Sequence, residues 1–199
     1  PEALRRHLNQ GRALESGANP AHFQAGTLLM TGSDLLLGGN NGAGNPRTAF
    51  TVGSGGLTMN GRTITLYRGN AGTVLNLLGN FTGTGSNVIT AGVVGDVEPE
   101  LNLGADTRTF DVTGGTTNIS VGIVGAGGLT KTGNGILTFT GNLNNTYSGT
   151  TTVSGGTLSL NQTAGTHAVS GPLVVTTGGT LSLLADEQIG DTPGIHVRG

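Results

Sequence analysis

The stretch GGTLSL at residues 155–160 returns unchanged at residues 178–183. A shorter stretch, Leu-Asn-Leu at 75–77, returns at 101–103. Strand-like sequence that recurs at a period in the twenties is typical of a solenoid, in which every turn of the coil stacks on the previous one. A β-sandwich also has frequent turns, but it does not repeat the same strand at such an interval. The repeats therefore predict a β-solenoid.

Apolar residues alternate with Thr, Ser or Asn inside the repeated stretches, as in Leu137-Thr138-Phe139. This period of two places the apolar side chains on one face of a strand and the polar ones on the other. The similarity of residues 53–58 to residues 125–130, several turns further along, extends the pattern. The predicted strands are 27–30, 34–37, 49–52, 57–59, 63–67, 73–78, 87–90, 100–103, 109–112, 118–121, 136–140, 150–153, 157–160, 173–176 and 180–184.

The composition fits a coil of short strands and excludes several function classes. The chain has 199 residues, of which 39 are Gly and 31 are Thr, while only 10% are charged. Gly suits the sharp corners of a coil and Thr suits the outer face of a strand. The absence of Cys excludes disulfides and thiolate chemistry. A net charge of −2 with a single Lys, Lys131, argues against a nucleic-acid partner, and no apolar run is long enough to span a membrane.

A period of about 23 residues predicts about eight turns of a right-handed parallel β-helix over residues 26–199. Residues 1–25 do not follow the strand pattern, and Leu4 and Leu8 are spaced as on one face of a short helix. We expect this segment to be either a cap over the first turn or a leader. Because the chain begins at Pro1 without Met, we expect a processed product or a fragment.

Residues 125–160 resemble a known family. They contain GAGGLTKTGNGILTFTG at 125–141, NTYSGTTTV at 145–153 and GGTLSL at 155–160. These motifs are similar to the autotransporter-associated β-strand repeat, also called the passenger-associated transport repeat. The resemblance implies a right-handed parallel β-helix outside a bacterium, in the passenger that precedes an outer-membrane barrel. Residues 161–199 continue the solenoid pattern instead of starting such a barrel.

Acidic residues provide two candidate calcium sites. Asp96, Glu98 and Glu100 alternate, so an extended segment would place their carboxylates on one side, where oxygen ligands could hold Ca²⁺. The alternative is a solvated corner loop, which Gly95 and Pro99 favour.

The second candidate calcium site is formed by Asp186, Glu187 and Asp191, and here too a polar loop is the favoured interpretation. The four histidines are far apart and lack metal-ligand spacing: His7, His22, His167 and His196. Tyr147 could stack on a ligand, although packing at a corner is the favoured role.

The prediction for function is a structural extracellular segment of a bacterial surface or secreted protein, acting as a stalk, adhesin or fibre. We predict no catalytic, cofactor-binding or metal-binding residue. The alternative is a polysaccharide-processing or carbohydrate-binding β-helix, which would need converging carboxylates or a row of exposed aromatic side chains. A glycan or another cell-surface ligand is a possible partner.

Residues 194–199 resemble the start of another turn and contain no capping signal. An open strand edge can pair with another chain. The sequence therefore predicts either a longer parent solenoid or end-to-end stacking of copies, which gives a filament because head-to-tail contacts do not close.

Overall fold

The computed structural model describes residues 23–38, 48–67, 72–92, 97–191 and 194–198. Every element in this part of the chain is a β-strand, and none of it forms a helix that could cross a membrane. The strands are β1 (Phe23–Met30), β2 (Leu35–Leu37), β3 (Thr48–Asn60), β4 (Thr63–Leu66), β5 (Thr73–Leu77), β6 (Phe81–Thr84), β7 (Ser86–Ala91), β8 (Glu100–Asn102), β9 (Arg108–Val112), β10 (Thr116–Ile119), β11 (Gly122–Val124), β12 (Leu129–Thr132), β13 (Ile136–Gly141), β14 (Thr151–Val153), β15 (Gly156–Gln162), β16 (Leu173–Val175), β17 (Gly179–Leu183) and β18 (Ile195–Val197).

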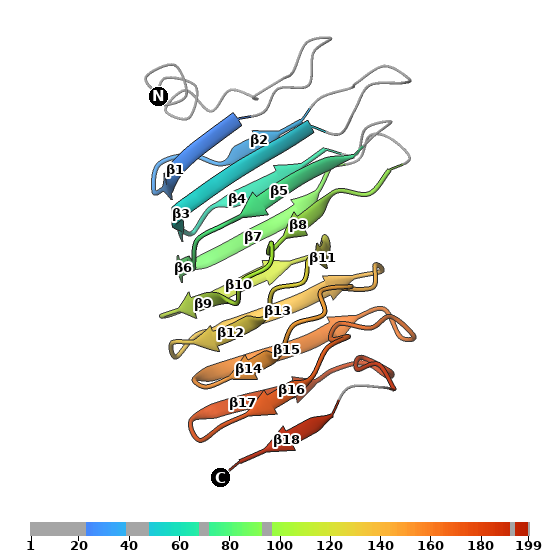
Figure 1. Cartoon of the computed structure of the whole chain (residues 1–199). Coiled ribbons are helices and arrows are strands. Elements are labelled where there is room, and N and C mark those ends of the chain that lie inside the picture. The colour runs from blue at the N-terminus through green and yellow to red at the C-terminus, as the bar shows by residue number, and fades with distance from the viewer. Residues whose placement is uncertain (1–22, 39–47, 68–71, 93–96, 192–193, 199) are drawn as a thin grey trace.

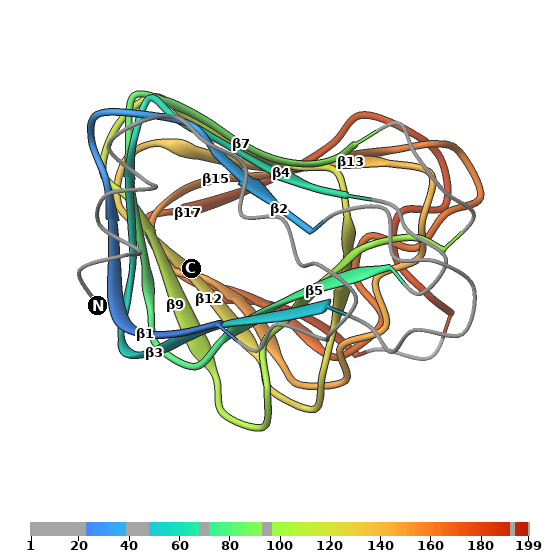
Figure 2. The ribbon, with the colours of Figure 1, turned by 90° about the horizontal axis from the view of Figure 1, so that it is seen from above.

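The strands stack into a coil along one axis, from β1 at one end to β18 at the other (Figure 1). One sheet has seven strands in the order β17-β15-β13-β10-β7-β4-β2, and all of its pairings are parallel. A view along the axis shows this sheet on one side and the second sheet opposite (Figure 2). The expected parallel β-solenoid is confirmed.

The second sheet has eleven strands because it bends around a corner of the coil. The first part of β3, up to Val52, pairs with β5, whereas its last part, from Leu57, pairs with β6. One continuous strand thus contributes to two faces of the coil. The two strands predicted at 49–52 and 57–59 are halves of β3, joined across the corner.

The turns are longer on average and less regular than the predicted period. The apolar positions that pair in register along the seven-stranded sheet are Leu35, Ile64, Ile89, Ile119, Phe139, Leu160 and Leu183. The longest step along the chain separates Ile89 from Ile119, and the shortest is the next one, from Ile119 to Phe139. Seven strands are separated by six steps, so this sheet spans about six turns and the expected eight are not confirmed. The predicted period came from the shorter, later turns.

Most of the predicted strands are present, but β6, β11 and β12 were not predicted. β6 contains Gly83 and β11 consists of only three residues, so neither has a clear alternation. β12 has the charged Lys131 at an inward position, so its sequence lacks the regular alternation of apolar and polar residues. At the other end, β1 begins at Phe23, inside the segment expected to be separate from the coil, and the predicted helix around Leu4 and Leu8 lies outside the described residues.

The alternation assigns the faces of the strands correctly. Leu158 and Leu160 are fully buried, and Ser159 between them is 6% exposed on the outer face of its sheet. Leu158 pairs in register with Leu137 and Leu181, so the three leucines form one inward row. The inward rows of all the ladders form the continuous core of the rod.

The two sides of β15 should respond differently to a charge. We expect Leu158→Asp to lower the free energy of unfolding by roughly 4 kcal/mol or more, because it buries a carboxylate between stacked turns. Asn161→Asp, two positions from Ser159 on the same outer face, should change it by less than about 1 kcal/mol, because Asn161 is exposed. Urea unfolding followed by circular dichroism measures both variants. Equal losses would show that the two faces are wrongly assigned.

Candidate functional site

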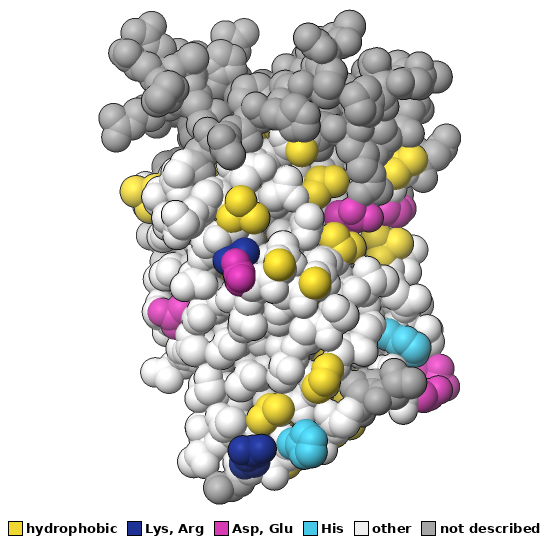
Figure 3. Space-filling model, in the orientation of Figure 1, with side chains coloured by type: hydrophobic (Ala, Val, Ile, Leu, Met, Phe, Trp, Pro, Cys, Tyr) yellow, Lys and Arg dark blue, Asp and Glu magenta, His cyan; other side chains and the backbone are white. Residues whose placement is uncertain are grey.

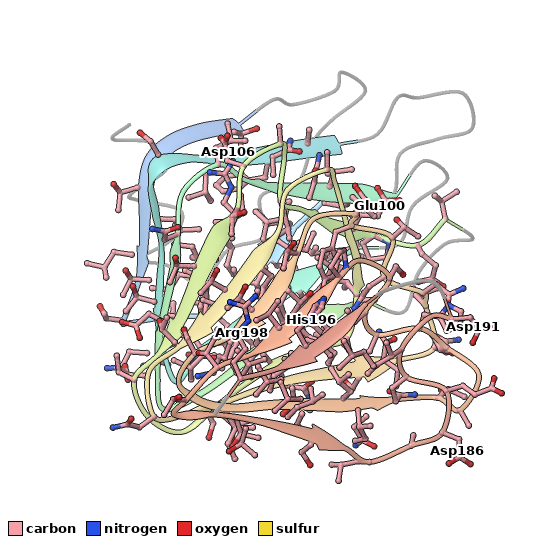
Figure 4. The ribbon with its side chains drawn as sticks, turned by 60° about the horizontal axis from the view of Figure 1, so that its bottom comes forward. Glu100, Asp106, Asp186, Asp191, His196 and Arg198 are labelled. Carbon is pink, nitrogen blue, oxygen red and sulfur yellow. The ribbon has the colours of Figure 1, made fainter. Side chains whose placement is uncertain are left out.

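The first predicted calcium site is only partly within the described residues. Glu98 and Glu100 are both partly buried near β8, and Asp96 lies outside the described part. Figure 4 shows Glu100 well apart from Asp186 and Asp191. Within the described ranges, no three His, Asp or Glu side chains are grouped so that they could hold a metal ion. Calcium binding that includes Asp96 remains a hypothesis.

The second predicted calcium site is a loop whose acidic side chains are exposed. Asp186 and Asp191 point outward at the edge of the coil (Figure 4). The loop is held from inside by Gln188, which is 3% exposed. The Gln188 side-chain oxygen accepts a hydrogen bond from the Gln162 N–H at 2.7 Å, and its amide donates to the Asp186 carbonyl at 3.0 Å. A neutral amide therefore orders this loop, which favours the polar-loop interpretation.

The described histidines have separate structural positions. The backbone N–H of His167 donates to the side-chain oxygen of Asn144 at 2.7 Å. His196 is exposed on the last strand, β18, near the end of the coil that faces the viewer in Figure 4. His7 and His22 lie outside the described residues.

In the part of the coil that the structure describes, two basic side chains are buried, and both bind backbone carbonyl groups. The first is Arg108 on β9, whose side chain is 9% exposed. Its guanidinium donates to the carbonyl oxygens of Leu103 and Leu78 at 2.8 and 2.7 Å, and Asp106 lies 3.4 Å away. These carbonyls belong to different turns, so Arg108 connects one turn to another.

The second buried basic residue is Lys131, which has no exposed surface. It occupies an inward row of the core between Phe110 on the preceding strand and Val153 on the following one. Its ammonium group donates to the carbonyl oxygens of Thr132, Gly133 (2.9 Å) and Gly155 (3.1 Å). Thus the aliphatic stem packs in the core and the charge reaches a corner.

Burial lowers the pKa of Lys131 to about 8, while the negative charge of Asp111 acts in the opposite direction. The amine is therefore mostly protonated at neutral pH. Asp111 also accepts a hydrogen bond from the Thr132 hydroxyl at 3.1 Å, so the carboxylate is fixed beside the same corner.

Buried polar side chains also organise the segment around Asn145. Its side-chain oxygen accepts from the Ile123 N–H, and its amide donates to the Ala168 carbonyl, each at 2.9 Å. Asn145 therefore replaces a strand pairing between the turns on either side of it. Tyr147 is fully buried, and its hydroxyl lies 2.6 Å from that of Thr151, which confirms that it packs in the coil.

The outer surface of the later turns has almost no charge. Between residues 112 and 185, Lys131 is the only Lys, Arg, Asp or Glu, and it is buried. Uncharged polar atoms and backbone cover most of the face seen in Figure 3, with isolated charged and apolar side chains. The exposed polar groups of these turns are therefore mostly hydroxyls and amides, beside the exposed apolar side chains of Ile136, Leu183 and Leu184.

The sequence alone did not predict the structural roles of four buried polar residues, Arg108, Lys131, Asn145 and Gln188. A signal existed for Lys131, because it occupies the apolar position in the alternation Leu129-Thr130-Lys131-Thr132. No local pattern identifies Asn145 or Gln188, since the side-chain partners of Asn145 and most of those of Gln188 are backbone groups far away along the chain.

Replacing Asn145 tests whether side chains hold this segment. Asn145→Ala leaves a buried N–H and a buried C=O without their partners, so we expect a loss of about 2–4 kcal/mol in unfolding free energy. Asn144→Ala is the matched control: it removes one bond at an exposed residue and should cost about 1 kcal/mol or less. Urea unfolding of both variants is the measurement. A loss for Asn144→Ala as large as for Asn145→Ala would contradict this role.

Comparison with known proteins identifies the segment that holds these contacts. Residues 129–160, which include Lys131, Asn145 and Tyr147, match the model of the passenger-associated transport repeat. The adhesin BmaC autotransporter of Brucella suis biovar 1 (strain 1330) is 43% identical over 82 residues, which are 41% of this chain but only 2% of that protein. No solved structure matches. This chain is thus a parallel β-solenoid that carries a passenger-associated transport repeat and is similar to a small part of an autotransporter adhesin.

Proposed function

We propose that this chain is a structural, adhesin-like segment of a passenger at the bacterial cell surface or secreted from it. The observation that carries the proposal is the passenger-associated transport repeat built into a continuous parallel coil. Each turn of such a coil adds one strand spacing of about 4.8 Å to a rod. A rod of this kind can hold a binding region away from the membrane.

We propose that the coil is right-handed, which the strong preference for right-handed connections between parallel strands supports. Residues that precede β1 would form a separate cap or leader segment.

A non-catalytic role is supported by the separation of Glu100 from Asp186 and Asp191 and by the lack of exposed charge between residues 112 and 185. A ligand for this surface would be recognised through hydroxyl and amide groups, as a neutral glycan would be.

Surface labelling tests the location. We expect an antibody raised against the purified chain to label intact cells of the bacterium that makes it as strongly as permeabilised cells, and external protease to weaken the signal. Labelling that appears only after permeabilisation would contradict the proposal.

Incubation of the chain with neutral and acidic polysaccharides distinguishes the enzymatic alternative from the structural role. Formation of new reducing ends that Glu98→Ala or Glu100→Ala abolishes would support that alternative instead.

The strand at the end of the described coil offers a surface for self-association. Ile195 and Val197 are 52% and 77% exposed, whereas Leu173 and Val175, their partners on β16, are 0% and 7% exposed. Gly194 and Arg198 use their backbone groups to bond β16. Because successive residues of a strand point these groups to opposite edges, those of Ile195 and Val197 face away from β16. We propose that another copy of the chain pairs with this edge, end to end.

A proline substitution in β18 distinguishes pairing of its outer edge with another copy from its existing pairing with β16. Ile195→Pro removes a donor on the outer edge only, so we expect it to block assembly while the coil stays folded. Ile195→Val keeps the donor and should assemble like the unchanged chain. Sedimentation velocity over a concentration series measures assembly. An unchanged chain that stays monomeric at the highest concentration, or a proline variant that still assembles, would contradict end-to-end pairing.

A further inference from the structure

The corner that follows β12 is rich in backbone oxygen atoms. Gly133 has φ +72° and Gly156 has φ +60°, which are backbone conformations that favour glycine. A Cβ atom at Gly133 would lie 2.3 Å from the Val112 carbonyl oxygen, and one at Gly156 would lie 2.4 Å from the Gly133 carbonyl oxygen. The corners of successive turns therefore stack in close contact, with carbonyl groups next to one another.

Three of these oxygen atoms surround a cation. The carbonyls of Thr132, Gly133 and Gly155 all accept hydrogen bonds from the Lys131 ammonium. Gly155 belongs to the next turn, so the contact joins two turns. The carboxylate of Asp111, on the preceding strand, adds negative charge beside them.

We propose that the carbonyl oxygens of Thr132, Gly133 and Gly155 form a cation-binding site at this corner of the coil, near the charge of Asp111, whose resident ligand is the tethered Lys131 ammonium. The ligand class of the site is a small monovalent cation, ammonium or potassium. Backbone carbonyl rings bind dehydrated monovalent cations elsewhere in proteins, and ammonium adds hydrogen-bond donors directed at the same oxygens.

Arg108 provides an independent observation for the same principle. It lies on β9, the strand next to β12, in a different inward row, where it pairs with Leu129. It too sends a buried positive charge to carbonyl oxygens of two separate turns, those of Leu78 and Leu103. Two neighbouring strands therefore bring a cation to a group of corner carbonyls, each at a different place in the coil.

The site accounts for a charge in the core that packing alone does not explain. The residues that share the inward row with Lys131, from Leu28 and Leu57 through Phe81 and Phe110 to Val153, are all apolar. An apolar side chain at position 131 would fill the row and leave three carbonyl oxygens without this donor. Carbonyl groups at this partly buried corner are less stable without a partner, and a cation satisfies all three at once. The inference concerns binding at this corner and does not depend on the proposed surface function.

Chemical rescue tests the site. Lys131→Ala removes the tethered cation and leaves the carbonyl oxygens in place. We expect its thermal unfolding midpoint to fall by several degrees in choline chloride and to recover at least half of that loss in ammonium chloride or potassium chloride of equal ionic strength. Choline is too large to enter, so it serves as the reference salt. If Lys131→Ala does not fold in choline chloride, the fraction that refolds from urea in each salt replaces the midpoint as the readout.

Two control variants make the test specific. Lys131→Met fills the space with an apolar side chain, so its midpoint should not differ among the three salts. Val153→Ala opens a space beside Lys131 in the same row but keeps the ammonium on these carbonyls, so it should also be indifferent to the cation. The proposal is overturned if Lys131→Ala has the same midpoint or refolded fraction in all three salts. It is equally overturned if Lys131→Met or Val153→Ala responds to ammonium as strongly as Lys131→Ala does.

Discussion

Each turn of this coil depends on the packing of its inward side chains against those of the turns above and below, in register with the parallel ladder. The row that passes through β9 shows the constraint most clearly. Phe81 and Phe110 occupy paired positions on β6 and β9, and their rings stack with centroids 5.4 Å apart. Because the ladder fixes the height of each strand, a side chain can pack only on the residue that the register brings to it. The core is therefore continuous along the rod although no single turn could enclose one.

The ladder leaves the corners as the difficult part of the fold. Strand backbone groups pair with the next turn, but the chain has to change direction between faces, and some carbonyl and N–H groups there lack a ladder partner. Such groups must be satisfied when they are buried. In the described part of the coil, the buried polar side chains Arg108, Lys131, Asn145 and Gln188 all bond backbone groups, mostly in other turns. Between residues 112 and 185 the one charged side chain, Lys131, thus lies inside, and the polar groups on the outer surface are mostly hydroxyls and amides.

Similarity in sequence and equivalence in the coil are not the same. The recurrence of Leu75 at Leu101 and of Leu158 at Leu181 corresponds to direct pairing in register. The similarity of residues 53–58 to 125–130 does not, because Leu57 stacks through Phe81 and Phe110 on Lys131, two positions beyond Leu129. The interval between equivalent positions varies because loops of different length join the faces. A prediction that assumed a constant period therefore misplaces equivalent residues, and its eight turns are not confirmed.

The sequence by itself determined the parallel coil, the inward and outward faces of most strands and the family of residues 129–160, because alternation and recurrence are local properties of the chain. It did not determine the number of turns, the continuity of β3 around a corner or the strands β6, β11 and β12. Nor did it show that Lys131 lies in the core. The partners of that ammonium include Gly155, in the next turn, and only the tertiary structure brings this carbonyl to it. A buried charge is stabilised by groups that are near in space and distant in sequence, so its role was decided by the stacking of the turns.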